Sequence, residues 1–208
     1  MVVVRSSVDG IFCAGADLKE RLSMTPDQVG DFVSGIRRTF SQVEGIPVPT
    51  IAAIDGAALG GGLELALACD LRTAGARAKM GLPETKLAII PGGGGTQRLP
   101  RVVGPAIAKQ MIFTGAPVDA ARALNLGLVN AIGDNGYEQA LGLARQILPQ
   151  GPVAVRMAKF AVNRGIEVDL ASGLAIEEAA YAQTIFTEDR IEGLKAFLGK
   201  RAPVYHGK

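Results

Sequence analysis

The feature that most constrains this chain is a strand, a glycine turn and a helix in direct succession between residues 50 and 70. The run from Thr50 to Ile54 is apolar and partly β-branched, which is typical of a buried strand. Three consecutive glycines, Gly60 to Gly62, then open a segment rich in Leu and Ala, the composition of a buried helix. The first N–H groups of a helix lack partners within it, so a ligand or a second backbone can approach this turn closely.

Glu64 stands one turn into this predicted helix, and no lysine or arginine lies within a turn to pair with it. Its neighbours three and four positions away are glycines on one side and Leu67 and Ala68 on the other. Because burial of an unpaired carboxylate is costly, these surroundings favour a functional site. The alternative is that Glu64 faces solvent in the first turn, where the helix dipole favours an acid.

Length and composition limit the class of protein. With 208 residues, 48% of them hydrophobic, the chain suits one domain, or one domain with an appendage, and can bury a core. The net charge of +2 is too small to imply a nucleic-acid partner, and no apolar run approaches the roughly 18 residues of a membrane span. Cys13 and Cys69 have no CxxC spacing and favour a reducing compartment. The opening residues 1–5 predict a strand with no targeting peptide before it.

Several common kinds of active site do not fit the residues present. The only histidine is His206, which excludes His-dependent nucleophilic triads and argues against a zinc site. The sequence has no GxSxG elbow, no phosphate-binding GxxxxGKS/T loop and no GxGxxG fingerprint. Its chemistry must therefore use carboxylates, backbone amides or the two thiols.

The order of predicted elements indicates two parts. Strands alternate with helices over residues 1–135, which predicts an α/β core that includes a short strand at 127–129. The sequence Thr25-Pro26-Asp27-Gln28 predicts a capped helix that ends near Glu44. Residues 136–208 are predicted to be a helical region that packs between subunits. Its expected helices cover 137–148, 152–165, 169–185 and 187–199.

Two glycine turns flank the candidate carboxylates. The turns at 14–17 and at 60–62 could each direct one N–H group toward a common oxygen, and two such donors would form an oxyanion hole. Glu64 and Glu84 would supply the paired carboxyl groups that acid–base chemistry needs. The alternative for Glu84 is an ordinary surface acid, because Pro83-Glu84-Thr85-Lys86 is locally polar. The sequence alone does not establish that the two turns converge.

Three motifs together resemble the crotonase, or enoyl-CoA hydratase/isomerase, superfamily: Phe12 to Lys19, Ala58 to Ala66 and Pro91 to Leu99. The resemblance extends over essentially the whole chain, including residues 189–201 at its end. The sequence of residues 15–21, 80–82 and 84–91 is most similar to the methylglutaconyl-CoA hydratase branch, whose members include proteins that bind AU-rich RNA. In that family, strands, a helix and a loop precede the point at which this chain begins. The resemblance implies repeated ββα units followed by a helical trimerisation region.

The resemblance also implies roles for particular residues. The backbone amides of Ala16 and Gly61 would form the oxyanion hole around the thioester carbonyl. Glu64 would act as base on the attacking water, Glu84 would give a proton to the α-carbon, and Gly92 would help to place the water. The residues implied to contact coenzyme A are Ala14, Ala16, Asp17, Lys19 and Gly61, together with Phe197 and Lys200 from a neighbouring subunit.

By this resemblance, the chain is expected to be a hydro-lyase that hydrates a 2-enoyl-CoA thioester, with 3-methylglutaconyl-CoA of leucine degradation as a candidate substrate. No cofactor or metal is expected, since coenzyme A is part of the substrate. The implied assembly is a homotrimer or a dimer of trimers, in a bacterial cytoplasm or a mitochondrial matrix. One alternative is an isomerase of the same fold. The other is a binding protein, including an RNA-binding one, although the basic residues are scattered and lack interleaved aromatics.

Overall fold

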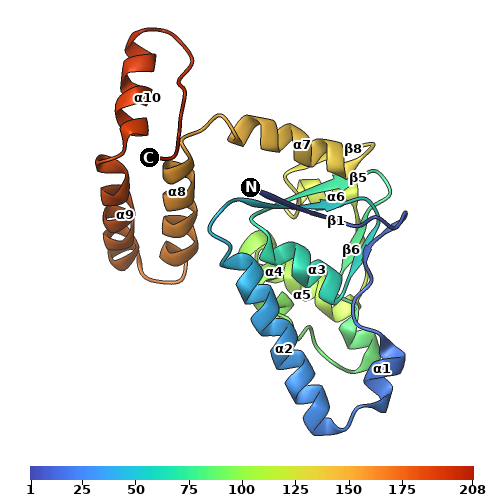
Figure 1. Ribbon diagram of the computed structural model, residues 1–208. Coiled ribbons are helices and arrows are strands. Elements are labelled where there is room, and N and C mark those ends of the chain that lie inside the picture. The colour runs from blue at the N-terminus through green and yellow to red at the C-terminus, as the bar shows by residue number, and fades with distance from the viewer. The chain divides into compact units, whose positions relative to one another are not determined.

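The computed structural model describes residues 1–208 and divides into two compact units. The larger unit comprises residues 2–46 and 50–141, and the smaller comprises 142–208 together with Met1 and residues 47–49. All eight strands belong to the larger unit, whereas the smaller one is built around helices (Figure 1).

The larger unit contains two four-stranded sheets. The strands of the first sheet are all parallel, in the order β1 (Val2–Arg5), β3 (Thr50–Ile54), β5 (Leu71–Gly75) and β8 (Ala131–Gly133). The second sheet has the order β2 (Ile11–Cys13), β4 (Ala57–Leu59), β6 (Lys79–Gly81) and β7 (Val118–Asp119), and only β7 is antiparallel. Each successive strand pair thus contributes one strand to each sheet, and the predicted α/β fold class is confirmed.

The helices of the larger unit are short apart from α2 (Pro26–Glu44). As predicted, α2 begins with a capping box, in which the side chains of Thr25 and Gln28 each bond to the other residue's backbone. The others are α1 (Leu18–Ser23), α3 (Gly61–Ala68), η1 (Glu84–Leu87), α4 (Gly95–Val103), α5 (Pro105–Thr114), α6 (Ala120–Asn125) and α7 (Gly136–Ile147), of which α7 continues into the smaller unit.

The strand predicted at residues 127–129 is wrong, because the strand lies at β8 instead. Leu128 and Val129 are buried, as an apolar strand would be, but their N–H groups donate to the carbonyl of Ala123 in α6. These bonds close the end of α6 as a turn. Bonding to β5 begins with Asn130, whose N–H donates to the carbonyl of Arg72, and the strand pairing runs from Ala131.

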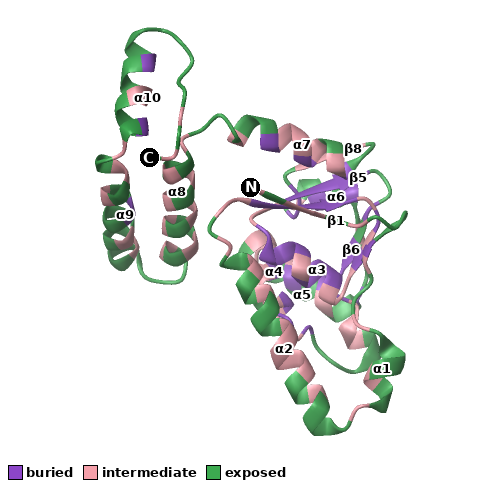
Figure 2. Ribbon diagram, viewed as in Figure 1, coloured by how far each residue is buried: buried purple, intermediate pink, exposed green.

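The core of the larger unit lies around β3 and α3. Every residue of β3 is buried, and six of the eight residues of α3 are buried, Glu64 among them (Figure 2). Arg72 in β5 is also buried, and its guanidinium donates to the carbonyls of Leu128, Cys69 and Ala66. A buried arginine is tolerated here because backbone carbonyls satisfy its donors.

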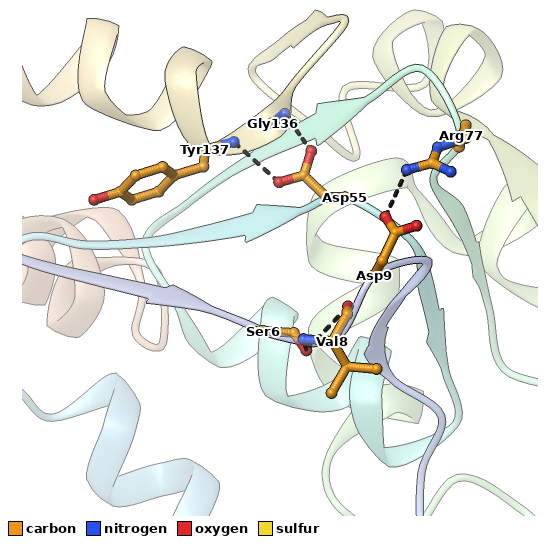
Figure 3. Close-up of polar contacts among 7 residues, drawn as sticks. All are labelled: Ser6, Val8, Asp9, Asp55, Arg77, Gly136 and Tyr137. Atoms are coloured by element: carbon orange, nitrogen blue, oxygen red, sulfur yellow. Dashed lines mark hydrogen bonds and ion pairs between the residues drawn. The ribbon is translucent and has the colours of Figure 1, made fainter.

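Figure 3 shows how one end of β3 is tied to other parts of the larger unit. Asp55, which follows β3, accepts hydrogen bonds from the backbone N–H groups of Gly136 and Tyr137 at the start of α7. A carboxylate at that position satisfies free helix N–H groups and complements the helix dipole. Nearby, Asp9 and Arg77 form an ion pair of 2.6 Å, but both side chains are largely exposed, so the pair adds little stability.

The smaller unit contains α8 (Pro152–Gly165), α9 (Leu170–Ile185) and α10 (Glu188–Leu198), and with α7 these confirm the four predicted helices. The buried carboxylate of Asp189 accepts hydrogen bonds of 2.7 Å from the N–H groups of His206 and Gly207, so the last residues fold back onto α10. No helix of the chain is both long enough and apolar enough to span a bilayer.

Candidate active site

Three neighbouring parallel strands position the predicted site. In the second sheet, β2 pairs with β4 and β4 pairs with β6, all running in the same direction. Their carboxyl ends therefore meet at one edge, the edge at which open α/β sheets bind ligands. The Ala14–Asp17 loop leaves β2 there, the Gly60–Gly62 turn leaves β4, and Glu84 follows β6 by three residues. Segments far apart in sequence are thus brought together, as the convergence hypothesis required.

The two predicted oxyanion loops are in van der Waals contact. A Cβ added to Gly15 would lie 3.5 Å from the backbone nitrogen of Gly61. A Cβ added to Gly62 would lie 1.8 Å from the carbonyl oxygen of Cys13, so only glycine lets the end of β2 pack against α3. Gly60 has a φ of 55°, a left-handed conformation that favours glycine. Because Gly61 is the first residue of α3, its N–H has no acceptor within the helix.

Glu64 is buried, with 3% of its surface exposed, so the alternative of a solvent-facing acid is wrong. Its Oε1 atom accepts two hydrogen bonds of 2.8 Å, from the backbone N–H groups of Gly93 and Gly95. Burial is the largest influence on the pKa of Glu64 and raises it. The two N–H donors and the positive charges of Arg98 and Arg37 oppose that rise, because they favour the carboxylate form.

Glu84 lies beside the Gly60 turn, where its Oε1 is 3.3 Å from the position of a Cβ added to Gly60. Its Oε2 atom is buried and has no hydrogen-bond partner in the protein, which an ordinary surface acid would not show. Burial, with a further contribution from the negative charge of Glu64, raises the pKa of Glu84 to about 7, although its own backbone N–H opposes the rise. Near neutral pH, Glu84 is therefore protonated for much of the time.

η1, which carries Glu84, is anchored to α5. The hydroxyl of Thr85 donates a 2.7 Å hydrogen bond to the carbonyl of Ile112. The side chain of Lys86 lies over Gly115, where a Cβ would meet its Cε at 2.9 Å. These contacts fix η1, and with it Glu84, against α5.

These features match a known family. The sequence model of the enoyl-CoA hydratase/isomerase family matches residues 1–208. The chain belongs to this family. It is 62% identical to rat methylglutaconyl-CoA hydratase, a mitochondrial protein, over 100% of the chain and 68% of that protein. A putative enoyl-CoA hydratase/isomerase of Bacillus subtilis, YngF, is 56% identical over 99% of the chain and 80% of that protein.

The fold agrees as well. The crystal structure of enoyl-CoA hydratase from Bacillus anthracis has a TM-score of 0.95 at 51% identity, and the match covers 100% of this chain and 81% of that one. The predicted resemblance, the crotonase fold and the enoyl-CoA hydratase type of enzyme are therefore confirmed. Members of such a family act on acyl-CoA thioesters, and mitochondrial and bacterial proteins are both among its relatives.

The remaining predicted residues are placed as follows. Ala14 is exposed and Ala16 is half-buried, on the loop beside Gly61. Asp17 caps α1, where it accepts a 2.8 Å hydrogen bond from the N–H of Lys19, whose side chain is exposed. Phe197 and Lys200 are exposed in the smaller unit, on α10 and just after it. Their assignment to a neighbouring subunit's coenzyme A stays a prediction.

Sequence reasoning missed the residues that hold Glu64. Within the glycine run at 92–95, only Gly92 was predicted to have a role, whereas Gly93 and Gly95 are the residues whose N–H groups donate to the carboxylate of Glu64. A run of glycines that opens a second helix was a usable signal, since such a turn exposes N–H groups for a buried acid. No sequence signal pointed to Arg37, which lies more than fifty residues earlier and bonds to the Gly92 carbonyl.

Proposed function

We propose that this chain adds water across the 2,3 double bond of a 2-enoyl-CoA thioester, with Glu64 as general base and Glu84 as general acid. The observation that carries the proposal is the difference between the two carboxyl groups. Burial raises the pKa of both carboxyl groups, but Glu64 also receives two backbone N–H donors and two nearby positive charges, which oppose that rise and favour its ionised form. Glu84 has a buried oxygen with no donor and a pKa of about 7, which favour its protonated form.

These two states suit the two proton transfers of a hydration. Glu64 would take a proton from water while the water oxygen bonds to C3, and the π electrons would move to the thioester carbonyl oxygen. The N–H groups of Ala16 and Gly61 would stabilise the negative charge that develops there. Glu84 would then protonate C2 and complete the β-hydroxy thioester. The two carboxyl groups would exchange protons with solvent before the next turnover, so this sequence needs no cofactor and no metal.

The substrate that we propose first is 3-methylglutaconyl-CoA. Support comes from the 62% identity with rat methylglutaconyl-CoA hydratase and from the sequence of residues 80–91, which includes Glu84. A hydratase for short linear enoyl-CoA thioesters is the competing assignment. Relative kcat/KM values for 3-methylglutaconyl-CoA and crotonyl-CoA distinguish the two substrates.

The decisive experiment follows the loss of enoyl-thioester absorbance with wild-type chain, Glu64→Gln and Glu84→Gln. Both variants keep side-chain size, and the amide oxygen that Glu64→Gln introduces can still accept from Gly93 and Gly95. We expect each to lower kcat by about 10²–10⁴-fold, the usual contribution of a positioned acid or base. The β-hydroxy product separates hydration from isomerisation. Normal turnover by both variants, with the fold intact by circular dichroism, would contradict the assignment.

We further propose that the chain works as a trimer or a dimer of trimers assembled through its smaller unit. Large apolar side chains are exposed on that unit, which is typical of a surface that another subunit covers. They include Leu170, Leu174, Tyr181, Phe186, Leu194 and Leu198. Sedimentation equilibrium tests this proposal, and a monomer at micromolar concentration would contradict it.

A further inference from the structure

The glycine loop from Pro91 to Gly95 is bonded on both of its sides. On one side, the N–H groups of Gly93 and Gly95 donate to Oε1 of Glu64. On the other, the carbonyl of Gly92 accepts from Nε of Arg37 at 3.2 Å, and the carbonyl of Gly93 accepts from Nη1 of Arg98 at 3.0 Å. A guanidinium from α2 and another from α4 thus hold the carbonyl side of the loop that holds Glu64.

One peptide group connects Arg37 to Glu64 directly. The Gly92 carbonyl and the Gly93 N–H belong to the same planar amide, so a bond at one end fixes the direction of the other. The carbonyl end faces a positive guanidinium, and the N–H end faces the carboxylate. This amide is therefore polarised in the sense that strengthens its bond to an ionised Glu64, as in other chains of hydrogen bonds.

The two arginines differ in how far their charge is compensated. Arg98 forms a 2.8 Å ion pair with Glu44, which offsets part of its positive charge. Arg37 has no carboxylate within ion-pair distance, and its hydrogen-bond partner is the Gly92 carbonyl. The charged groups that act on Glu64 are thus Arg98 from α4, Arg37 from α2 and, in the opposite sense, Glu84 from η1.

Helix α2 also supports the loop sterically. A Cβ on Gly92 would meet Val33 at 2.7 Å, and a Cβ on Gly93 would meet Phe40 at 2.9 Å and Ile36 at 3.0 Å. Side chains from one helix face therefore press on the same peptide that Arg37 bonds. α2 packs on the loop as a rigid surface, and Arg37 adds a charge and a directed donor to it.

We propose that Arg37 is a positioning residue for Glu64, which acts through the Gly92–Gly93 peptide to aim the Gly93 N–H and to keep the carboxylate ionised. This inference rests on the proposed function, because it assigns Arg37 to the base of that reaction. Arg37 does not touch the reacting atoms. Since its side chain is exposed, water screens its charge, and the effect is expected to be moderate.

The test compares Arg37→Gln with Arg38→Gln. Both variants remove one positive charge from adjacent exposed positions of α2, but only Arg37 bonds to the glycine loop. In Arg37→Gln, the acidic limb of the kcat/KM profile should move to higher pH by about half to one unit. The loss is then about threefold to tenfold at pH values below the acidic limb and disappears on the alkaline side of it, since one pKa unit is a factor of ten. Arg38→Gln should match wild type, and Arg37→Lys should recover part of the shift.

A direct titration keeps this test separate from the test of the function. The carboxyl infrared band that Glu64→Gln removes reports the ionisation of Glu64 even in a chain that does not turn over. Its midpoint should rise in Arg37→Gln and stay in place in Arg38→Gln. An unchanged midpoint in Arg37→Gln, an equal shift in Arg38→Gln, or a loss of kcat/KM that is uniform across pH would overturn the proposal. Absence of turnover with the expected midpoints would refute the proposed function and leave the positioning role supported.

Discussion

Substitution of Gly93 by alanine is the sharpest single perturbation of the site. Gly93 does not have a positive φ, so its backbone conformation accepts alanine without strain. The added Cβ, however, would lie 2.6 Å from Oε2 of Glu64 and 2.9 Å from Cε2 of Phe40. Because Phe40 is part of α2, which packs on the loop, the displacement falls mainly on the carboxylate of Glu64. The same change disturbs the N–H group that holds this carboxylate.

Two magnitudes follow from these contacts. Overpacking by one methyl group in a tight site costs about 1–3 kcal/mol of folding free energy. A catalytic group moved by about 1 Å can lose 10²-fold in rate, so we expect kcat/KM to fall by at least that factor. The KM should change less than kcat, because the loop contacts the base and not the bulk of the substrate.

Gly30→Ala, at an exposed position of α2, is the matched control. Gly30 lies in α2, and a Cβ there would meet nothing within 4 Å. The Gly30→Ala substitution should raise the free energy of unfolding by roughly 0.5–1 kcal/mol, as glycine-to-alanine changes in helices do, without altering turnover. Thermal unfolding gives the change in stability, and the loss of enoyl-thioester absorbance, followed well below both melting temperatures, gives the change in turnover. A folded Gly93→Ala chain with a wild-type kcat/KM would refute the assignment of Glu64 as base.

Two further predictions concern stability. The pKa of Glu84 rises from 4.5 to about 7 in the folded chain. Below about pH 4.5 the carboxyl group is protonated in the folded and the unfolded chain, so it does not change the free energy of unfolding. As pH rises toward 7 the unfolded chain loses this proton more readily than the folded one, and Glu84 therefore destabilises the fold. Glu84→Gln should therefore be more stable than wild type at about pH 8, by roughly 1–2 kcal/mol after allowance for solvent contact, and this gain should vanish near pH 4.5 in denaturant titrations. A gain independent of pH would contradict this origin. Arg72→Lys should cost about 2–4 kcal/mol in the same titrations, because a lysine cannot reach the three carbonyls that the planar guanidinium satisfies. A cost below about 1 kcal/mol would show that these carbonyls find other partners.

Neighbouring residues along the chain account for the local elements and for the chemistry available. The capping box of α2 and the buried strand β3 depend on adjacent residues, which is why they could be predicted within a residue or two. The three motifs identified the family, and the resemblance to that family singled out Glu64 and Glu84 as the carboxyl groups of interest. The prediction at residues 127–129 failed because apolar residues can be buried in a turn as well as in a strand.

How these groups work together depends on contacts that only the folded chain makes. The pairing of β2, β4 and β6 joins strand ends that are far apart in sequence, and no local pattern encodes which strands become neighbours. The difference between the two glutamates likewise depends on long-range contacts. Gly93 and Gly95 donate to Glu64 from another element, whereas Oε2 of Glu84 is buried with no donor. Identical side chains therefore meet different combinations of burial, donors and charge in the fold, and the pKa of a carboxyl group depends on those surroundings.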